Sequence, residues 1–330
     1  MKRIPLSIVL GALLLAPDAE AQQSRNPIEI KEWEVPYGAD TRPRDPFAFE
    51  GRVWFVGQAG NYVAYLDPAS GEFKRYEIEE GTHPHNLIVD ERGVWYAGNR
   101  NARIGLLNPE TGSIRTFPMP DPAARDPHTL VFADNGTLWF TAQQGGFIGH
   151  LVPNSGDVHL VKTAERARPY GINLDPQGRP WVNLFGTNLI ATVDAATMEL
   201  KTYAIPREAA RTRRIEVTSD GIVWAVDYAQ GFLIRFDPAT GQFKEWPMPG
   251  GSESRPYAME VDDMDRLWFV ESGIQPNTFV GFDPKTESFF SITPIPSGGG
   301  TVRHMYFEPT KREIWFGTDV GTIGKAVLPK

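Results

Sequence analysis

The sequence predicts an all-β protein, a seven-bladed β-propeller of four-stranded antiparallel blades. Three observations predict it: short strands in repeated groups of four, a tryptophan at a constant place in each group, and many glycines and prolines without a long helical period. The chain of 330 residues contains 32 Gly and 28 Pro. The tryptophans are separated by 41, 44, 42, 43, 44 and 47 residues and are Trp54, Trp95, Trp139, Trp181, Trp224, Trp268 and Trp315. Repeats of about 40 residues with four strands each are typical of propeller blades.

One unit, residues 127–161, shows the pattern clearly. An apolar strand at 130–132 is followed by the turn pair Asn135-Gly136, and further strands are expected at 138–141, 147–151 and 158–161. Asn-Gly between apolar runs is a strong hairpin signal. Four strands cannot bury both faces of their own sheet, so the unit requires copies of itself on either side.

The last unit lacks its fourth strand, and we expect the N-terminus to supply it. The predicted blades cover residues 45–80, 82–121, 125–165, 168–207, 211–251, 254–298 and 300–330. The segment Ile28–Glu34 resembles the fourth strands in its pattern of residues, and no strand before it in the sequence could pair with it. As the outermost strand of blade seven it would close the ring and remove an open sheet edge. We interpret the tryptophans as packing between adjacent blades.

The first 21 residues are typical of a signal peptide. Met1-Lys2-Arg3 is positively charged, residues 4–16 are apolar, and Ala19-Glu20-Ala21 matches a cleavage site. We expect the mature chain, residues 22–330, to be one propeller domain that is periplasmic or secreted; a membrane anchor is the alternative interpretation. The chain has no cysteine, and its net charge of −8 argues against a nucleic-acid or membrane partner. No motif for an organic cofactor is present, and we expect a monomer.

The first strands of a propeller line its central channel, so the residues that begin them should meet at one mouth. We place these starts at Pro46-Phe47, Pro84-His85, Pro127-His128, Pro169-Tyr170, Thr212-Arg213, Pro256-Tyr257 and Arg303-His304. A proline fixes the direction of the chain around it. The predicted ring at the mouth therefore consists of His85, His128, Tyr170, Arg213, Tyr257 and His304. We expect Arg213 to hold an anionic group, and Arg207, Arg211 and Arg214 to be solvated.

Three carboxylates follow the second-strand tryptophans by three or four residues: Asp227, Glu271 and Asp319. They belong to blades five to seven, so we expect them on one side of the channel. A carboxylate beside an imidazole can bind a divalent cation or tune the histidine as a base. The alternative interpretation is that these groups satisfy one another and bound water.

Units such as PHTLVFADNGTLWFTAQQGGFIGHLVP and RPYGINLDPQGRPWVNLFGTNLIATV resemble the streptogramin B (virginiamycin B) lyase family across residues 28–330. The resemblance implies a seven-bladed propeller that opens a cyclic depsipeptide at its ester by elimination, with Mg²⁺ polarising the ester and a histidine transferring the α-proton. His304 matches the base-like histidine, and Asp319 matches one metal-ligand acid. Val302 stands in place of a ligand glutamate, for which Glu271 is a substitute. Tyr257 occupies the position at which the family has a second active-site histidine. Phe47 occupies the position of the family's first-blade tyrosine.

We therefore expect an exported lyase-like enzyme that uses Mg²⁺, or another divalent cation such as Ca²⁺, on a small or peptide-like ester or lactone. In this hypothesis His304 and Tyr257 are catalytic, and Asp319 and Glu271 bind the metal. The expected substrate-binding residues are Arg213, Tyr170, His85, His128 and Asp227. Two alternatives remain: a non-catalytic propeller that binds a ligand or protein, and a metal-dependent hydrolase of the lactonase type.

Overall fold

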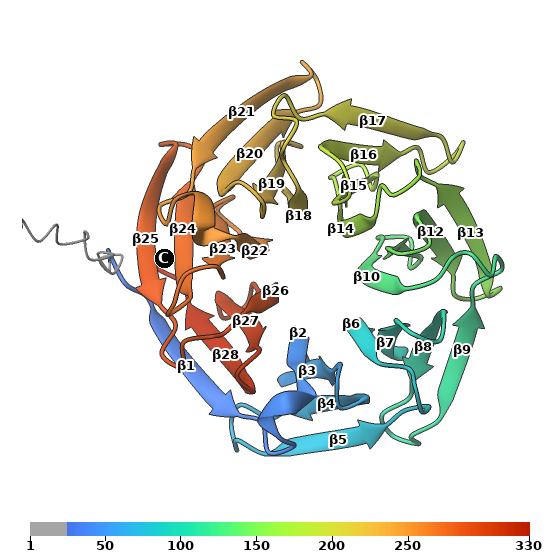
Figure 1. Cartoon of the computed structure of the whole chain (residues 1–330). Helices are drawn as coiled ribbons and strands as arrows, with labels where there is room; N and C mark the ends of the chain where they lie inside the picture. The colour runs from blue at the N-terminus through green and yellow to red at the C-terminus, as the bar shows by residue number, and fades with distance from the viewer. Residues whose placement is uncertain (1–24) are drawn as a thin grey trace, which may run out of the picture.

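The computed structural model describes residues 25–330, and the predicted signal peptide, residues 1–21, lies outside them. Seven four-stranded antiparallel sheets stand around a common axis, as the sequence predicts (Figure 1). Within the described residues, no helix has the length and apolar character to cross a membrane. The only helical segments there are two short 3-10 turns, η1 (Ala39–Thr41) and η2 (Ser252–Ser254).

Each of the first six blades uses four consecutive strands, ordered from the axis outward. Blade one contains β2 (Pro43–Phe49), β3 (Arg52–Gly57), β4 (Tyr62–Leu66) and β5 (Phe73–Glu77), and blade two contains β6 (Pro84–Asp90), β7 (Gly93–Gly98), β8 (Arg103–Leu107) and β9 (Ile114–Pro118). Blade three contains β10 (Pro127–Phe132), β11 (Leu138–Ala142), β12 (Phe147–Val152) and β13 (Asp157–Lys162), and blade four contains β14 (Pro169–Leu174), β15 (Pro180–Leu184), β16 (Leu189–Val193) and β17 (Leu200–Ala204). Blade five contains β18 (Thr212–Val217), β19 (Val223–Asp227), β20 (Phe232–Asp237) and β21 (Gln242–Pro247), and blade six contains β22 (Pro256–Val261), β23 (Leu267–Glu271), β24 (Thr278–Asp283) and β25 (Ser288–Pro294).

Blade seven combines both ends of the chain, which confirms the predicted closure. It contains β26 (Val302–Glu308), β27 (Glu313–Thr318) and β28 (Thr322–Val327), and β1 (Glu29–Glu34) is its outermost strand. The β1–β28 ladder is antiparallel and runs from Glu29 opposite Val327 to Glu34 opposite Thr322. The ring of Trp33 on β1 also stacks on that of Trp315, with centroids 5.5 Å apart.

The repeated tryptophans are structural, as expected from their spacing. Trp54 of blade one, for example, belongs to a core cluster with Leu87 and Val94 of blade two. The indole nitrogen of Trp95 also donates to the carboxylate of Asp90, the last residue of the first strand β6, at 3.1 Å. Blades four and six repeat this bond. These three tryptophans, Trp95, Trp181 and Trp268, thus fasten a hairpin in addition to filling an interface between blades.

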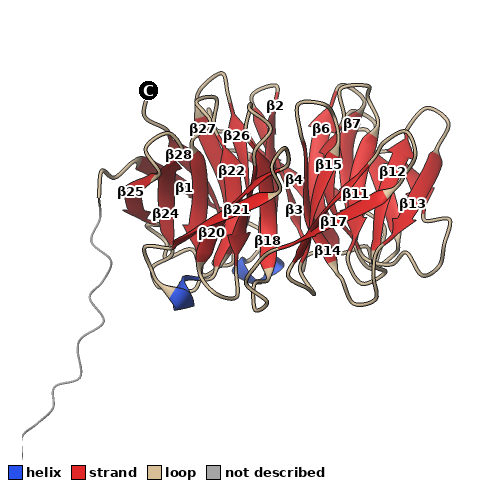
Figure 2. Ribbon diagram, turned by 90° about the horizontal axis from the view of Figure 1, so that it is seen from above, coloured by secondary structure: helices blue, strands red, loops and turns tan. Residues whose placement is uncertain are grey.

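All seven first strands carry a register shift at their start. In blade five, Thr212 pairs with Asp227, but the next ladder pair is Ile215 with Ala225. A bulge of this kind breaks the alternation of a strand and redirects its side chains. The shifts lie at the rim where η1 and η2 precede their first strands (Figure 2). Two consecutive residues per blade can therefore reach other blades at this rim.

Candidate functional site

The residues that follow the first position of each innermost strand form a ring at this rim, which we call the mouth ring. Its members are Arg44, His85, His128, Tyr170, Arg213, Tyr257 and Arg303. The His85 and His128 rings are 3.5 Å apart between centroids, and the His128 and Tyr170 rings are 4.0 Å apart. The hydroxyls of Tyr170 and Tyr257 share a hydrogen bond. The structure thus brings together the five predicted ring residues of blades two to six.

Blades one and seven contribute arginines to the ring, and this corrects the sequence-based alignment. Phe47 was expected at the ring position of blade one, but Pro43 pairs with Gly57 as Pro84 pairs with Gly98, which places Arg44 there. Phe47 lies deeper and packs on the ring of Tyr306, 4.1 Å away between centroids. In blade seven Arg303 takes the ring position, and His304 is the next residue along the strand.

Below the mouth ring, Arg214 crosses the channel from blade five. It was expected to be solvated, but it is only 2% exposed. Its Nε donates to the carbonyl oxygen of Arg303 at 2.9 Å, and its Nη1 donates to the hydroxyl of Thr129 at 3.1 Å. Its Nη2 also lies 3.6 Å from the Asp45 carboxylate. One side chain therefore connects blades one, three, five and seven.

The buried carboxylate of Asp45 balances part of this positive charge. It accepts hydrogen bonds from Arg44 Nε at 2.8 Å and from Asn86 Nδ2 at 3.0 Å. Burial opposes its ionisation, but the adjacent guanidinium of Arg44 keeps the pKa of Asp45 well below its usual value. Asp45 is therefore a fixed negative charge under the mouth ring.

The three predicted acids do not gather at one place. Asp227 and Glu271 are fully buried. The Asp227 carboxylate accepts the backbone N–H of Arg211 at 2.9 Å, and Glu271 accepts the backbone N–H of Gly250 at 2.7 Å. These two acids fasten loops, so they do not line the mouth. Asp319, which follows its tryptophan by one residue more, pairs with Arg303 instead. Asp227 and Glu271 are the last residues of their strands, whereas Asp319 lies in the turn after β27.

Arg213 lies in a cage of aromatic rings. Its guanidinium carbon is 3.9 Å from the ring centroid of Tyr228, and 4.4 Å from those of both Tyr257 and Phe185. Within residues 25–330 it forms no ion pair with a carboxylate. Its Nη1 donates to the hydroxyl of Tyr170 at 3.4 Å, and its buried Nε has no hydrogen-bond partner. Aromatic faces stabilise a cation without neutralising it. Arg213 is therefore a positioned cation with donors available for an anion.

The two hydrogen-bonded tyrosines differ in acidity. Burial raises the pKa of Tyr170, so its hydroxyl remains protonated. Burial also opposes ionisation of Tyr257, but the guanidinium groups of Arg213 and Arg44 outweigh it and lower the pKa of Tyr257 to about 8. Tyr257 is thus the group in this pair that gives up its proton. A phenolate there accepts the Tyr170 hydrogen bond and faces the Arg213 cation.

The model of the virginiamycin B lyase family matches residues 28–326. This chain belongs to the virginiamycin B lyase family. A search of curated proteins found no match.

Solved structures agree with the family in fold. A virginiamycin B lyase from Staphylococcus aureus is 21% identical with a TM-score of 0.81, and covers 92% of this chain and 100% of its own. A streptogramin B lyase is 24% identical with a TM-score of 0.82, and covers 93% and 100%. A catalytically inactive variant of the S. aureus lyase with quinupristin is 22% identical with a TM-score of 0.80, and covers 91% and 100%. At these identities the likeness shows the shared propeller.

The residues at the mouth do not fit the divalent cation that the family resemblance implies. Hard cations require several oxygen ligands. In residues 25–330 no group of three or more His, Cys, Asp and Glu side chains is placed to hold a metal. Both oxygens of Asp319 are bonded by the guanidinium of Arg303, and Val302 is buried and apolar. The magnesium prediction stays untested, but here a guanidinium takes the carboxylate that the ion would need.

The histidine implied as a base is neutral in this arrangement. Burial and the nearby cation of Arg214 lower the pKa of His304 to about 3, although Asp45 acts in the opposite sense. Its Nδ1 is buried and has no hydrogen-bond partner. Burial likewise lowers the pKa values of His85 and His128 well below the usual value. The positive charge of the mouth thus comes from arginines, and a histidine with so low a pKa is a weak base.

Proposed function

We propose that this chain is a carbon–oxygen lyase that opens an ester or lactone-like linkage by elimination, with Tyr257 as the base and Arg213 as the binder of the developing oxyanion. One observation carries the proposal. A guanidinium without a carboxylate partner lies 4.4 Å from the ring of a tyrosine whose hydroxyl is hydrogen-bonded to Tyr170. Elimination requires a base and a cation beside each other, because the proton leaves while charge builds on the adjacent carbonyl oxygen.

The reaction balances without water. The Tyr257 phenolate takes the proton from the carbon next to a substrate carbonyl, and the electron pair of that bond passes into an enolate stabilised by Arg213. The enolate then forms a carbon–carbon double bond as the β-carbon–oxygen bond breaks. The ester oxygen leaves with the bonding pair as a carboxylate. The proton then passes from Tyr257 to solvent, and no oxidant or co-reactant is consumed.

The other mouth residues have supporting roles in this proposal. Tyr170 donates its hydroxyl hydrogen to Tyr257 and orients the phenolate. Arg303, held by Asp319, and Arg44, held by Asp45, lower the pKa of Tyr257 further. The rings of His85 and His128 continue the mouth ring from Tyr170, whose ring centroid is 4.0 Å from that of His128. They are neutral and thus suited to contact a substrate rather than to carry charge.

The proposed substrate is a peptide-like ester or lactone. Quinupristin, which occurs with the inactive S. aureus enzyme in a solved structure, provides a starting compound. Export through the predicted signal peptide is part of the proposal. It is tested by N-terminal sequencing of the mature protein, which should begin after Ala21; a retained leader would contradict it.

The test is a mass-spectrometric assay on a panel of depsipeptide lactones, with and without EDTA. Elimination gives a linear product of unchanged mass with a new double bond, whereas hydrolysis adds one water. We expect turnover that resists EDTA and that falls at least ~100-fold in Tyr257→Phe, since a general base contributes about 10²–10⁴-fold. The control Tyr76→Phe removes a hydroxyl from outer strand β5 and should retain activity. Products one water heavier, or full activity in Tyr257→Phe, would reject the mechanism.

A non-catalytic binding propeller is the second candidate, because the histidine implied by the family is neutral and Asp319 is engaged by Arg303. This function uses the same anion site. It predicts that lactones with an acidic group bind to the wild type and are recovered unchanged, and that Arg213→Gln abolishes the binding. Turnover of any such compound by the wild type would exclude it.

A further inference from the structure

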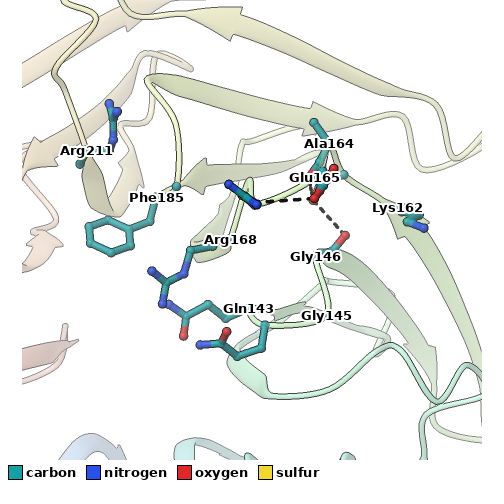
Figure 3. Close-up of a pocket in the computed structure, with 13 residues that line it drawn as sticks. Gln143, Gly145, Gly146, Lys162, Ala164, Glu165, Arg168, Phe185 and Arg211 are labelled. Carbon is teal, nitrogen blue, oxygen red and sulfur yellow. Dashed lines mark hydrogen bonds and ion pairs between the residues drawn. The ribbon is translucent and has the colours of Figure 1, made fainter.

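An open cavity of about 1050 Å³ lies beside the mouth ring, between blades three and four. Its walls come from the turn after β11, the loop between β13 and β14, and the turn after β15, with Arg211 at one side (Figure 3). Figure 3 shows Arg168 and Gln143 extending toward one another within it. None of the roles proposed above uses this cavity.

The cavity is positively charged in a chain whose net charge is −8. Four cations line it, namely Lys162, Arg166, Arg168 and Arg211, against the single acid Glu165. Glu165 pairs with Arg166 at 3.7 Å. The guanidinium of Arg211 donates only to backbone carbonyls, and neither Arg168 nor Lys162 forms an ion pair within residues 25–330. Arg168 also interacts with the carboxylate of Asp126, which accepts the backbone N–H of Gln144 in the cavity wall. With Asp126 and Glu165 set against the four cations, about two positive charges are uncompensated, which favours an anionic ligand.

Phe185 is the common wall of this cavity and the mouth. The guanidinium carbon of Arg168 is 5.8 Å from its ring centroid, and that of Arg213 is 4.4 Å from the same centroid. The two guanidinium carbons are therefore at most about 10 Å apart, the sum of these two distances. A small ligand held by Arg213 can reach Arg168 across this span.

The loops that carry the cations are held by close backbone contacts. A Cβ at Gly186 would overlap the carbonyl oxygen of Arg166, and a Cβ at Gly145 would lie 2.5 Å from that of Ala123. The backbone N–H of Phe185 also donates to the carbonyl oxygen of Arg168 at 3.1 Å. The cavity walls are thus fixed before any ligand arrives, which reduces the entropy lost on binding.

We propose that this cavity is a second anion subsite, so that the protein selects ligands with two carboxylates that reach both guanidinium groups, whose carbons are at most about 10 Å apart. One carboxylate binds to Arg168 and the other occupies the Arg213 cage. The inference rests on the anion-binding role proposed for Arg213, where a ligand carboxylate takes the place of the developing oxyanion, but it concerns binding and does not require turnover. It identifies the substrate class as an acidic, peptide-like molecule rather than a neutral lactone.

Isothermal titration with two probes tests the subsite. The probes are triglutamate, which carries several carboxylates, and N-acetylglycine, which carries one. We expect Arg168→Gln to weaken triglutamate binding about tenfold and to leave N-acetylglycine binding within about twofold, because a charged hydrogen-bonded contact contributes at least this much. Arg213→Gln should weaken both probes about tenfold or more. The matched control is Arg115→Gln on β9, where an exposed guanidinium lies 4.5 Å from the Phe117 ring outside the cavity.

The outcomes separate the subsite from the proposed function. Loss of triglutamate affinity in Arg168→Gln but not in Arg115→Gln supports the subsite, whether or not the protein turns over any lactone. Equal triglutamate affinity in Arg168→Gln and wild type overturns it, even if Tyr257→Phe proves inactive. An equal loss of triglutamate affinity in Arg168→Gln and in the control Arg115→Gln overturns it as well, and so does a wild type that does not bind triglutamate.

Discussion

Replacing His304 by glutamine should change how the stability of the protein depends on pH. The side chain is held under the mouth ring, where Arg214 and Arg44 repel a positive imidazole and Asp45 attracts one. Burial and these two cations together outweigh the attraction by Asp45, so the pKa of His304 is lowered from 6.5 to about 3. Glutamine is of similar size and polarity, and it does not titrate in this range.

The sign follows from the protons bound in each state. Between about pH 3 and 6.5 the unfolded chain binds a proton at His304 and the folded chain does not. The stabilisation is complete above pH 6.5 and is lost as the pH falls through 6.5 toward 3. At about pH 5 this linkage lowers the free energy of unfolding by roughly 2 kcal/mol. His85 and His128 act in the same direction.

Urea unfolding followed by tryptophan fluorescence measures the effect at about pH 7 and 5. The free energy of unfolding of wild type minus that of His304→Gln should fall by roughly 2 kcal/mol between the two pH values. The control Asn154→Gln changes an exposed side chain that does not titrate, in the turn before β13, and its difference from wild type should be the same at both. A wild-type-minus-His304→Gln difference that stays constant, or that grows on acidification, would refute the burial of a neutral imidazole.

Arg214→Met should lower the free energy of unfolding by about 3–5 kcal/mol in urea, because it breaks a buried charge network around Asp45; a loss below about 1 kcal/mol would contradict the channel crossing. Burial raises the pKa of Glu260 from 4.5 to about 8, so stability is full below pH 4.5 and is lost as the pH rises through 8. The wild type should therefore lose about 2 kcal/mol relative to Glu260→Gln between about pH 6.5 and 8.5, and an equal pH profile for both would argue against it. Deletion of residues 22–34 should lower Tm and cause aggregation in light scattering, since it exposes β28 as an edge strand; an unchanged Tm would contradict closure by β1.

The fold could be predicted because one interaction repeats seven times. Each tryptophan packs between blades, so its spacing reports the blade length directly. The missing strand of blade seven could also be predicted, because Ile28–Glu34 had the alternation of an outer strand and no earlier partner. The pairing of β1 with β28 begins one residue later than expected.

The site was only partly predictable, for two physical reasons. Pro46 resembles the start of a first strand, but it precedes Trp54 by eight residues, whereas the other first strands begin 11–13 residues before their tryptophans. Counting back from Trp54 gives Pro43 and therefore Arg44. The second reason is the bulge, which sends Arg213 and Arg214 toward other blades together, although strand alternation would send one of them away.

The three acids that follow tryptophans are close together in the sequence-based prediction but separate in the structure. Asp227 and Glu271 were grouped with Asp319 because all three follow a tryptophan closely. Asp227 and Glu271 end their strands and are buried partners of loop N–H groups, whereas Asp319 lies one residue past the end of β27. The role of Arg303 as the partner of Asp319 needed the fold, since nothing in the order of the sequence joins blade-seven residues 16 positions apart.

The central claim is that arginines at the mouth create an acidic tyrosine. Ultraviolet difference titration of the tyrosinate band, on wild type and Tyr257→Phe, measures it most directly. We predict that one tyrosine of the wild type ionises with a midpoint near pH 8 and that this transition is missing from the variant. If no wild-type tyrosine ionises well below the value of about 10 for the free side chain, or if Tyr257→Phe keeps the transition, the claim is contradicted.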